Sequence, residues 1–385
     1  MASVNGELNM VDANILLVLG NGFDLAHKMS TSYKNILCDI FVNLVDMKNV
    51  KFTGIYYQKY LKHVFDENMI KIIFEAYRGL WSRDYQKIST FNLSELEKDL
   101  NGAYGYAIQY LYNYGNWWIY YFFNVVTDRN RRIGNGWVDF ESEIHRVVYN
   151  VENMILGRSC EAYIKDKFGR YVNDLNTLRE DFIPILKIDL MVLKTIIEFY
   201  LKREETCDNE RKLAFFSTMK NVKAVLSYNY THTYQNLYSK TLSNICYLHG
   251  EVTRHNLVLG TDETLPAEYK NIIVECASLK KLYQVIYYKL GNSFKNVFSK
   301  ADDLSADWEA IIYGHSLTPA DKYSLEWLFT KLDNGCFAGY IKHIIIYYVD
   351  EKSYHEQLTN LFQIIGQEHV LEYTSDNSIE FKQIK

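Results

Sequence analysis

An asparagine and a histidine, each directly after a short apolar run, have side chains suited to proton-transfer chemistry. Asn229 lies in the segment Ser227–Thr231, where its amide could orient a water molecule or a ribose hydroxyl, or could cap the next helix. His249 precedes Gly250. Imidazole titrates near neutral pH and can accept a proton, although a histidine before a glycine is also a common turn residue. Taken singly, each residue can equally have a structural role, as a helix cap for Asn229 and as a turn residue for His249.

A glycine-rich turn ends the first apolar run of the chain. Its residues are Gly20, Asn21, Gly22, Phe23 and Asp24. A turn between a strand and a helix directs backbone N–H groups at a phosphate, and two glycines let the backbone approach closely. The third glycine of GxGxxG is replaced by Leu25, so a simple tight turn with Asp24 as helix cap is the alternative. We expect Gly20–Asp24 to bind a cofactor, and a side chain at Gly22 to obstruct binding while the chain stays folded.

A second turn of small and polar residues follows the run Trp308–Tyr313. Gly314 and Ser316 suit a close approach of the backbone to a ligand, and His315 and Asp321 lie in the same segment. The alternative is an ordinary loop between a strand and a helix, with Asp321 as the helix cap. We expect Gly314, His315, Ser316 and Asp321 to bind the same cofactor.

Short apolar runs rich in Ile, Val and Tyr predict the strands that position these residues. The runs are Ile15–Leu19, Val222–Leu226, Asn244–Leu248, Trp308–Tyr313 and His343–Val349. Such runs are typical of strands buried on both faces of a parallel sheet, and a buried helical segment is the alternative for each. Polar clusters follow the first four. Because ligands bind at the carboxyl edge of an open parallel sheet, these clusters predict one nucleotide or dinucleotide site.

The expected fold class is α/β, with a Rossmann-like parallel sheet interrupted by a large helical insertion. Residues 1–50 and 216–385 are predicted to form the nucleotide-binding domain, and residues 51–215 the insertion. Within the insertion, apolar residues recur at helical spacing in Tyr104–Val126, Phe140–Ile155 and Leu186–Leu201. Arg129–Gly136 is predicted to be an exposed loop.

Composition limits the partners and the compartment. A net charge of −5 gives no general attraction to nucleic acid or an anionic membrane, and a solvated loop explains the basic stretch Arg129–Arg132 equally well. No apolar run is long enough for the core of a signal peptide or for a membrane span. No two of the six cysteines form a CxxC pair, so no zinc or other metal site is expected. We therefore expect a cytoplasmic protein with reduced thiols and no membrane or nucleic-acid partner.

Three segments resemble the AbiH abortive-infection family of phage-defence proteins. They are LLVLGNGFDLAHKMSTSYKNIL near the start, WVDFESEI with Trp137, Asp139 and Glu141 in the insertion, and IIYGHSLTPAD towards the end. The resemblance touches both ends and the middle of the chain. It implies an antiphage role, with a phage protein as the trigger.

A wider resemblance is to sirtuin-like defence NADases. The segments SYNYTHTYQNLY, CYLHGEV, VLGTDE and YGHSLTPAD follow the order in which turns of those enzymes surround NAD. This implies a sirtuin-like fold, with Asn229 and His249 as the catalytic pair. It also places Gly20, Gly22, Gly314 and Ser316 at nucleotide-contacting positions. Two features differ: the opening reads GNGFD where GAGxS is usual, and Thr231 replaces an Asp. The zinc cysteines of deacetylating sirtuins are absent, which argues against deacetylation.

Together with these resemblances, the residues predict an NAD+ glycohydrolase that cleaves the nicotinamide–ribose bond of its substrate NAD without a bound metal. Cleavage builds oxocarbenium character on the ribose, as in glycoside hydrolysis. Asn229 would orient the ribose or the attacking water, and neutral His249 would accept a proton. A homo-oligomer is expected. The alternative is a non-catalytic nucleotide-binding sensor or signalling module of phage defence, which would not require the Asn229/His249 pair.

Overall fold

The computed structural model describes most of the chain outside residues 41–101. The described residues are 13–33, 35–37, 39–40, 102, 105, 107, 116–127, 140–168, 172, 174–206, 213–239, 242–261, 274–290, 297–298 and 307–384. Several sequence-based expectations lie outside them: the loop Arg129–Gly136, the residues Trp137 and Asp139, most of residues 51–115, and the thiols of Cys38 and Cys207.

Residue contacts divide the chain into two compact units. The first comprises Met1–Met29, Asp208–Gly250 and Val285–Lys385, and the second comprises Ser30–Cys207 and Glu251–Gln284. The first unit holds every strand of the sheet and all the residues predicted to form the site. The sequence-based division into residues 1–50 with 216–385 and residues 51–215 stays a prediction.

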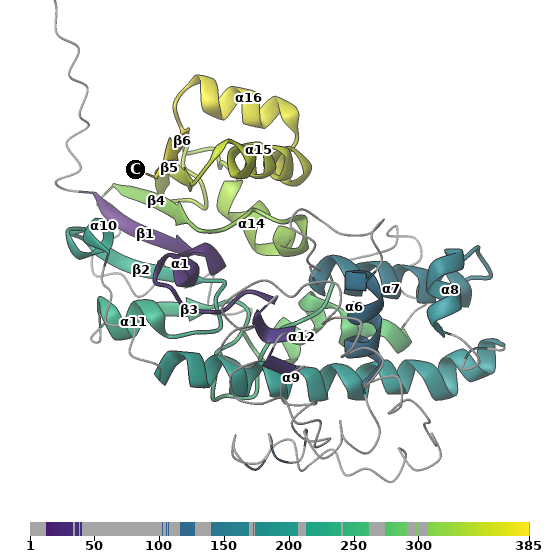
Figure 1. The fold of residues 1–385 in the computed structure, drawn as a ribbon. Coiled ribbons are helices and arrows are strands. Elements are labelled where there is room, and N and C mark those ends of the chain that lie inside the picture. Colours follow the sequence, from purple (N-terminus) through teal and green to yellow (C-terminus); the bar gives the residue numbers. More distant parts are fainter. Residues whose placement is uncertain are drawn as a thin grey trace, which may run out of the picture. The chain divides into compact units, whose positions relative to one another are not determined.

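A six-stranded parallel sheet forms the centre of the first unit (Figure 1). Its strands are β1 (Asn14–Leu19), β2 (Val222–Ser227), β3 (Ile245–Tyr247), β4 (Trp308–Tyr313), β5 (Ile341–Tyr348) and β6 (Ile379–Gln383). The order across the sheet is β3-β2-β1-β4-β5-β6, and every neighbouring pair is parallel. This is the strand order of the Rossmann fold, in which the direction of winding reverses between β1 and β4. The predicted α/β, Rossmann-like class is confirmed, and the sirtuin-like placement stays a prediction.

Alternation of side chains along the strands divides the apolar core between the two faces of the sheet. Leu16 and Val18 of β1 belong to one cluster, whereas Leu17 and Leu19 belong to the other. Helices α14 (Lys322–Phe329), α15 (Glu351–Ile365) and α16 (Gln367–Ser375) contribute to the first cluster. Helices α1 (Asn21–Ala26), α10 (Ala214–Ser217) and α11 (Thr233–Leu237) contribute to the second. Both faces of the sheet are therefore covered.

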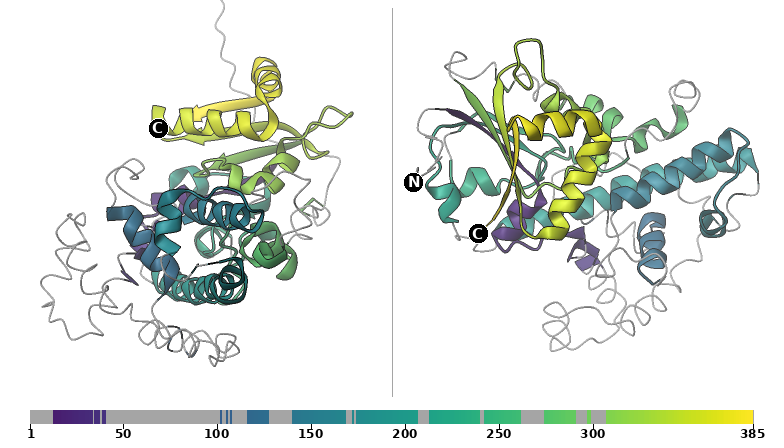
Figure 2. Two further views of the ribbon diagram at one scale, coloured as in Figure 1. Left: turned by 90° about the vertical axis from the view of Figure 1, so that its right-hand side faces the viewer. Right: turned by 90° about the horizontal axis from the view of Figure 1, so that it is seen from above.

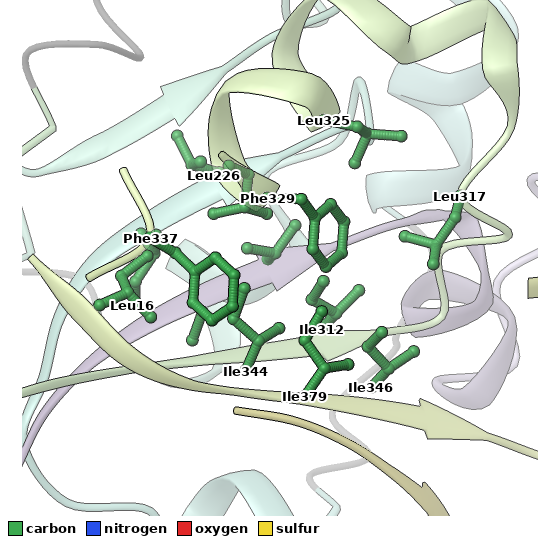
Figure 3. Close-up of a cluster of buried hydrophobic side chains, with 14 of the residues drawn as sticks. Leu16, Leu226, Ile312, Leu317, Leu325, Phe329, Phe337, Ile344, Ile346 and Ile379 are labelled. Carbon is green, nitrogen blue, oxygen red and sulfur yellow. The ribbon is translucent and has the colours of Figure 1, made fainter. Parts of the chain in front are cut away.

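The first cluster shows how a helix closes over the strands. Figure 3 shows Leu325 and Phe329 of α14 against Ile312 of β4 and Ile344 of β5. The right-hand view of Figure 2 shows α15 and α16, in yellow, side by side beside the strands. Burial of a large apolar side chain contributes about 1.5–3 kcal/mol, so this cluster holds the carboxyl ends of the strands in place.

The second unit is helical in its described residues. Its elements are α6 (Trp117–Thr127), α7 (Phe140–Ile155), α8 (Ala162–Phe168), the π-helical turn η5 (Thr177–Phe182), α9 (Ile183–Thr206) and the 3-10 helix η7 (Val274–Leu279), followed by α12 (Lys281–Tyr287) at the boundary between the units. α9 is the long teal helix of Figure 1. Its Asp189 accepts a hydrogen bond from the backbone N–H of Trp117 at 2.5 Å, which satisfies a donor at the start of α6.

The sequence located three of these helices. α7 has the predicted bounds, α9 contains Leu186–Leu201, and α6 covers the last ten residues, 117–126, of the predicted Tyr104–Val126. Among the described residues, no helix has the length and apolar character needed to cross a membrane. The described cysteines, Cys160, Cys246, Cys276 and Cys336, are free thiols.

Candidate functional site at the carboxyl edge of the sheet

The two glycine-containing turns lie next to each other at the point where the strand order reverses. One follows β1 and the other follows β4, and ligands of open α/β sheets bind outside such a point. The backbone N–H of Gly22 donates to the carbonyl of Gly314 at 2.8 Å, and that of Gly20 donates to the carbonyl of Tyr313 at 3.0 Å. The structure thus brings together both turns that the sequence assigned to the cofactor.

The glycines permit the two turns to touch each other. A Cβ atom on Gly22 would lie 2.6 Å from the Cα of Gly314, and one on Gly314 would lie 2.3 Å from the backbone nitrogen of Phe23. Gly314 also has a φ of +70°, which disfavours other residues. A side chain at Gly22 would therefore disturb the turns themselves, contrary to the expectation that the fold would stay intact. Phosphate binding by Gly20–Asp24 stays a prediction.

A buried carboxylate lies between two imidazoles beyond the ends of β3 and β4. Asp321 ends a short 3-10 helix, η8 (Pro319–Asp321), ahead of α14. Its Oδ1 lies 2.8 Å from Nε2 of His249, and its Oδ2 lies 3.4 Å from Nε2 of His315. All three residues are at most 5% exposed. A carboxylate in this position orients both rings.

The hydrogen bonds distinguish the two histidines. Nδ1 of His315 accepts the backbone N–H of Leu317 at 2.9 Å, so its proton lies on Nε2 and faces Asp321. Nδ1 of His249 has no hydrogen-bond partner in the described part of the chain. With Nε2–H of His249 donating to the carboxylate, Nδ1 presents a lone pair. His249 is the imidazole of this pair that can accept a proton from a ligand or from water.

Tyr228 supports both rings from the end of β2. Its ring centroid lies 5.3 Å from that of His249 and 4.1 Å from that of His315. Its hydroxyl is 2.8 Å from Oγ of Ser324, which donates to the carbonyl of Asp321 at 3.1 Å. Because the hydroxyl proton of Ser324 is used there, Tyr228 donates to Ser324. Burial raises the pKa of Tyr228 well above its ordinary value, so the phenol stays neutral.

Asn229 lies in a different environment from its neighbour Tyr228. Tyr228 joins the cluster on the α14 side, whereas Asn229 lines a pocket on the α1 side that has space for about one water molecule. The pocket is lined by Leu19, Phe23, Asp24, Val225, Ser227, Asn229, Thr231, Thr233, Tyr234, Ile245 and Tyr247. Oδ1 of Asn229 is buried and has no hydrogen-bond partner among the described residues.

Asp24 and Thr231, at which the chain differs from the sirtuin-like pattern, meet in this pocket. The Thr231 hydroxyl donates to Oδ2 of Asp24 at 2.6 Å. The predicted pair of Asn229 and His249 is divided between this pocket and the Asp321 cluster, and no hydrogen bond joins the two side chains in the structure described. Their catalytic roles stay predictions.

The remaining predicted residues have less distinctive surroundings. Asn21 and Ser316 are exposed beside the two turns. Phe23 is a core residue whose ring packs edge-on against Phe216, with centroids 4.9 Å apart. These positions provide access or packing, and none of them adds a group that is oriented for proton transfer.

Sequence reasoning missed Tyr228, Ser324 and His27. His27 is fully buried; its Nδ1 donates to the carbonyl of Phe23 at 2.7 Å, and its Nε2 accepts from the Tyr238 hydroxyl at 2.6 Å. It fastens the C-terminal end of α1 to α11. The period-two alternation after β2 is the signal that could have placed Tyr228 opposite Asn229.

Among the described residues, no group of three or more His, Cys, Asp or Glu side chains has a geometry that could hold a metal ion.

The family described as bacteriophage abortive infection AbiH matches residues 16–338 of the chain. The chain belongs to the AbiH family. No curated protein and no solved structure matches it.

The AbiH match contains every residue of the candidate site, from Gly20 to Asp321. Strands β5 and β6 with α15 and α16 follow the matched region. The family description supports a role in bacteriophage abortive infection, as the AbiH resemblance implied.

Proposed function

We propose that this AbiH protein is a phage-defence enzyme that hydrolyses NAD+ at the nicotinamide–ribose bond, with His249 as the general base. The observation that carries the proposal is the hydrogen bond between Nε2 of His249 and Asp321, at the edge of the sheet where Rossmann-like proteins bind ligands. The carboxylate fixes the orientation of the ring, which leaves Nδ1 of His249 available to a ligand or to water.

In the proposed reaction a water oxygen forms a bond to C1′ of the ribose while the bond from C1′ to the nicotinamide nitrogen breaks. The water proton passes to Nδ1 of His249 and then to solvent, and the products are nicotinamide and ADP-ribose. The positive charge of the pyridinium is neutralised as nicotinamide leaves. Asp321 and His315 act as positioning residues, because they set the orientation of His249 without needing to touch the substrate.

Asn229 has a different part in this proposal. It lies in the pocket on the α1 side, so it would contact a portion of the substrate other than the one facing His249. A nucleotide that extends along the carboxyl edge would reach both. A phage protein as trigger and a homo-oligomeric state are parts of the same proposal.

The test is to incubate the purified full chain with NAD+, NADP+ or ATP, with and without phage proteins, and to measure released nicotinamide or other cleavage products. A general base typically contributes about a hundred- to ten-thousand-fold in rate. His249→Ala should lower hydrolysis by that factor while retaining NAD+ affinity by calorimetry. His355→Ala, at an exposed histidine of α15, is the matched control and should hydrolyse at the unmodified rate.

Two results would overturn the catalytic proposal. One is hydrolysis by His249→Ala as fast as by the unmodified protein. The other is NAD+ binding without hydrolysis even when the phage proteins are present, which would favour the nucleotide-binding sensor.

A further inference from the structure

The pocket on the α1 side places two buried polar side chains, Asp24 and Asn229, among apolar residues. Asp24 is 1% exposed and Asn229 is 5% exposed, so both side chains are far more than nine-tenths buried. Oδ1 of Asn229 lines this pocket and has no donor among the described residues. A buried acceptor without a donor is costly, which makes it a place where a ligand gains by supplying one.

One threonine hydroxyl of the pocket donates to Asp24, and a second lies next to the first. Thr231 donates to Oδ2 of Asp24 at 2.6 Å, and Oγ1 of Thr233 lies 3.1 Å from Oγ1 of Thr231. Thr231 therefore has no proton left for a ligand. What this pocket offers is the amide oxygen of Asn229 beside the carboxylate of Asp24.

Charge and size narrow the class of group that fits. The negative charge of Asp24 repels a phosphate, so this side chain is suited to another part of a nucleotide. The pocket has space for about one water molecule, which corresponds to a single hydroxyl or amino group.

We infer that the pocket formed by Asp24, Asn229 and Thr231 selects nucleotides that present a neutral hydrogen-bond donor, a ribose hydroxyl or an amino group, and that Asp24 is the specificity-determining residue. The inference rests on the proposed function in taking the ligand to be a nucleotide. It does not depend on hydrolysis, because recognition at this pocket is separate from proton transfer at His249.

The experiment is calorimetric binding of a ligand panel to the full chain. The panel is NAD+, its analogues that lack one ribose hydroxyl, and its analogues in which the carboxamide or the adenine amino group is replaced by an oxygen function. The variants are Asp24→Asn, which keeps the shape, and Thr231→Val with Thr231→Ser as its conservative partner. Glu356→Gln, an exposed site on α15, is the control for the change in charge.

Asp24→Asn should weaken NAD+ binding about ten- to a hundredfold, the range expected for a hydrogen bond to a charged group. The analogue that lacks the recognised donor should bind the unmodified chain equally weakly, and Asp24→Asn should weaken it no further. If an analogue that lacks a ribose hydroxyl binds more weakly, the recognised donor is that hydroxyl. If an analogue with an oxygen function in place of an amino group binds more weakly, the recognised donor is that amino group. Thr231→Val should weaken NAD+ binding because it removes the hydroxyl that orients Asp24. Thr231→Ser keeps a hydroxyl and should bind NAD+ as the unmodified chain does.

Unchanged NAD+ affinity in a folded Asp24→Asn variant, or equal weakening of every analogue, overturns the pocket assignment. If Asp24→Asn does not fold, the Thr231→Val and Thr231→Ser pair decides in the same way. Binding of NAD+ that depends on Asp24 but leads to no hydrolysis overturns the catalytic proposal and supports the pocket. An unmodified chain that binds none of the nucleotides overturns both.

Discussion

Asp24 and Asp321 are both buried carboxylates at the carboxyl edge of one sheet, but their partners differ. Asp321 is bonded to His249 and lies beside His315, groups that can carry a proton. Asp24 accepts from Thr231, a neutral hydroxyl. The first arrangement suits proton transfer and the second suits recognition of a donor, because only an ionisable partner can exchange a proton near neutral pH.

The closeness of the two glycine turns predicts an unequal response to one added methyl group. Gly314→Ala should destabilise the first unit by more than Gly335→Ala, as measured by urea unfolding. Both glycines have positive φ, +70° and +75°, so each alanine carries a left-handed cost of about 1–2 kcal/mol. A Cβ atom at Gly314 would also clash with backbone atoms of the neighbouring turn. A Cβ atom at Gly335 would have nothing within 4 Å. Equal losses would show that the turns separate without cost.

At the scale of elements, apolar runs predicted strands β1 to β5. β1 is buried at all six of its residues. Because helices cover both faces of the sheet, such a strand is apolar along its whole length and can be recognised in the sequence. β6 was missed because it is an edge strand with the sequence Ile-Glu-Phe-Lys-Gln, in which polar residues interrupt the apolar signal. α15 and α16 were not predicted either, although Asp350 and Ser353 form a capping box at the start of α15.

The same periodicity explains what the sequence could and could not say about the site. That polar residues gather at the carboxyl edge follows from parallel strands, and the structure confirms that the turns after β1 and β4 meet. Which residues meet depends on the face to which each side chain points. Tyr228 and Asn229 are consecutive and face opposite ways, and His249 lies on the side of Tyr228. Predicting this separation of Asn229 from His249 would require the end of each strand to be known to within one residue.

Packing of α14 on the strands gives a prediction for this element. Phe329→Ala should lower the free energy of unfolding of the first unit by about 3–5 kcal/mol, since it removes a buried ring from the core that Figure 3 shows. Glu326→Ala, exposed on the same helix, should change it by less than about 0.5 kcal/mol. Urea unfolding followed by far-UV circular dichroism compares the two. Similar losses in both variants would mean that the helix contributes through its propensity and not through its packing.

At the scale of the whole molecule, ionisable groups are buried in both units. In the second unit Lys194 of α9 lies in the interior, and its Nζ donates to Oε1 of Gln284 at 3.0 Å. Burial lowers the pKa of Lys194 to about 7, and the nearby charge of Glu198 opposes that shift. The ordinary pKa of lysine, 10.5, applies once the chain unfolds. Folding therefore releases a proton from Lys194 at any pH between these two values.

This difference in pKa predicts that Lys194 makes the second unit more stable as the pH rises. Below pH 7 the amine is protonated in both states, so the cost of burying its charge is present in full. Above pH 7 the unfolded chain binds one more proton than the folded chain, and stability increases with pH until the unfolded amine also titrates. From pH 7 to pH 9 the gain in stability from this group is about 2 kcal/mol.

Hydrogen exchange of the α9 amides at several pH values, corrected for the intrinsic exchange rates, measures this gain. Lys194→Met has a side chain of similar length without the charge. Its free energy of unfolding should lack the increase due to Lys194, while the pH dependence due to every other group stays the same. If the unmodified and Lys194→Met proteins gain stability in parallel over this range, Lys194 is charged in the folded chain at neutral pH and the interior around Gln284 is more polar than its burial implies.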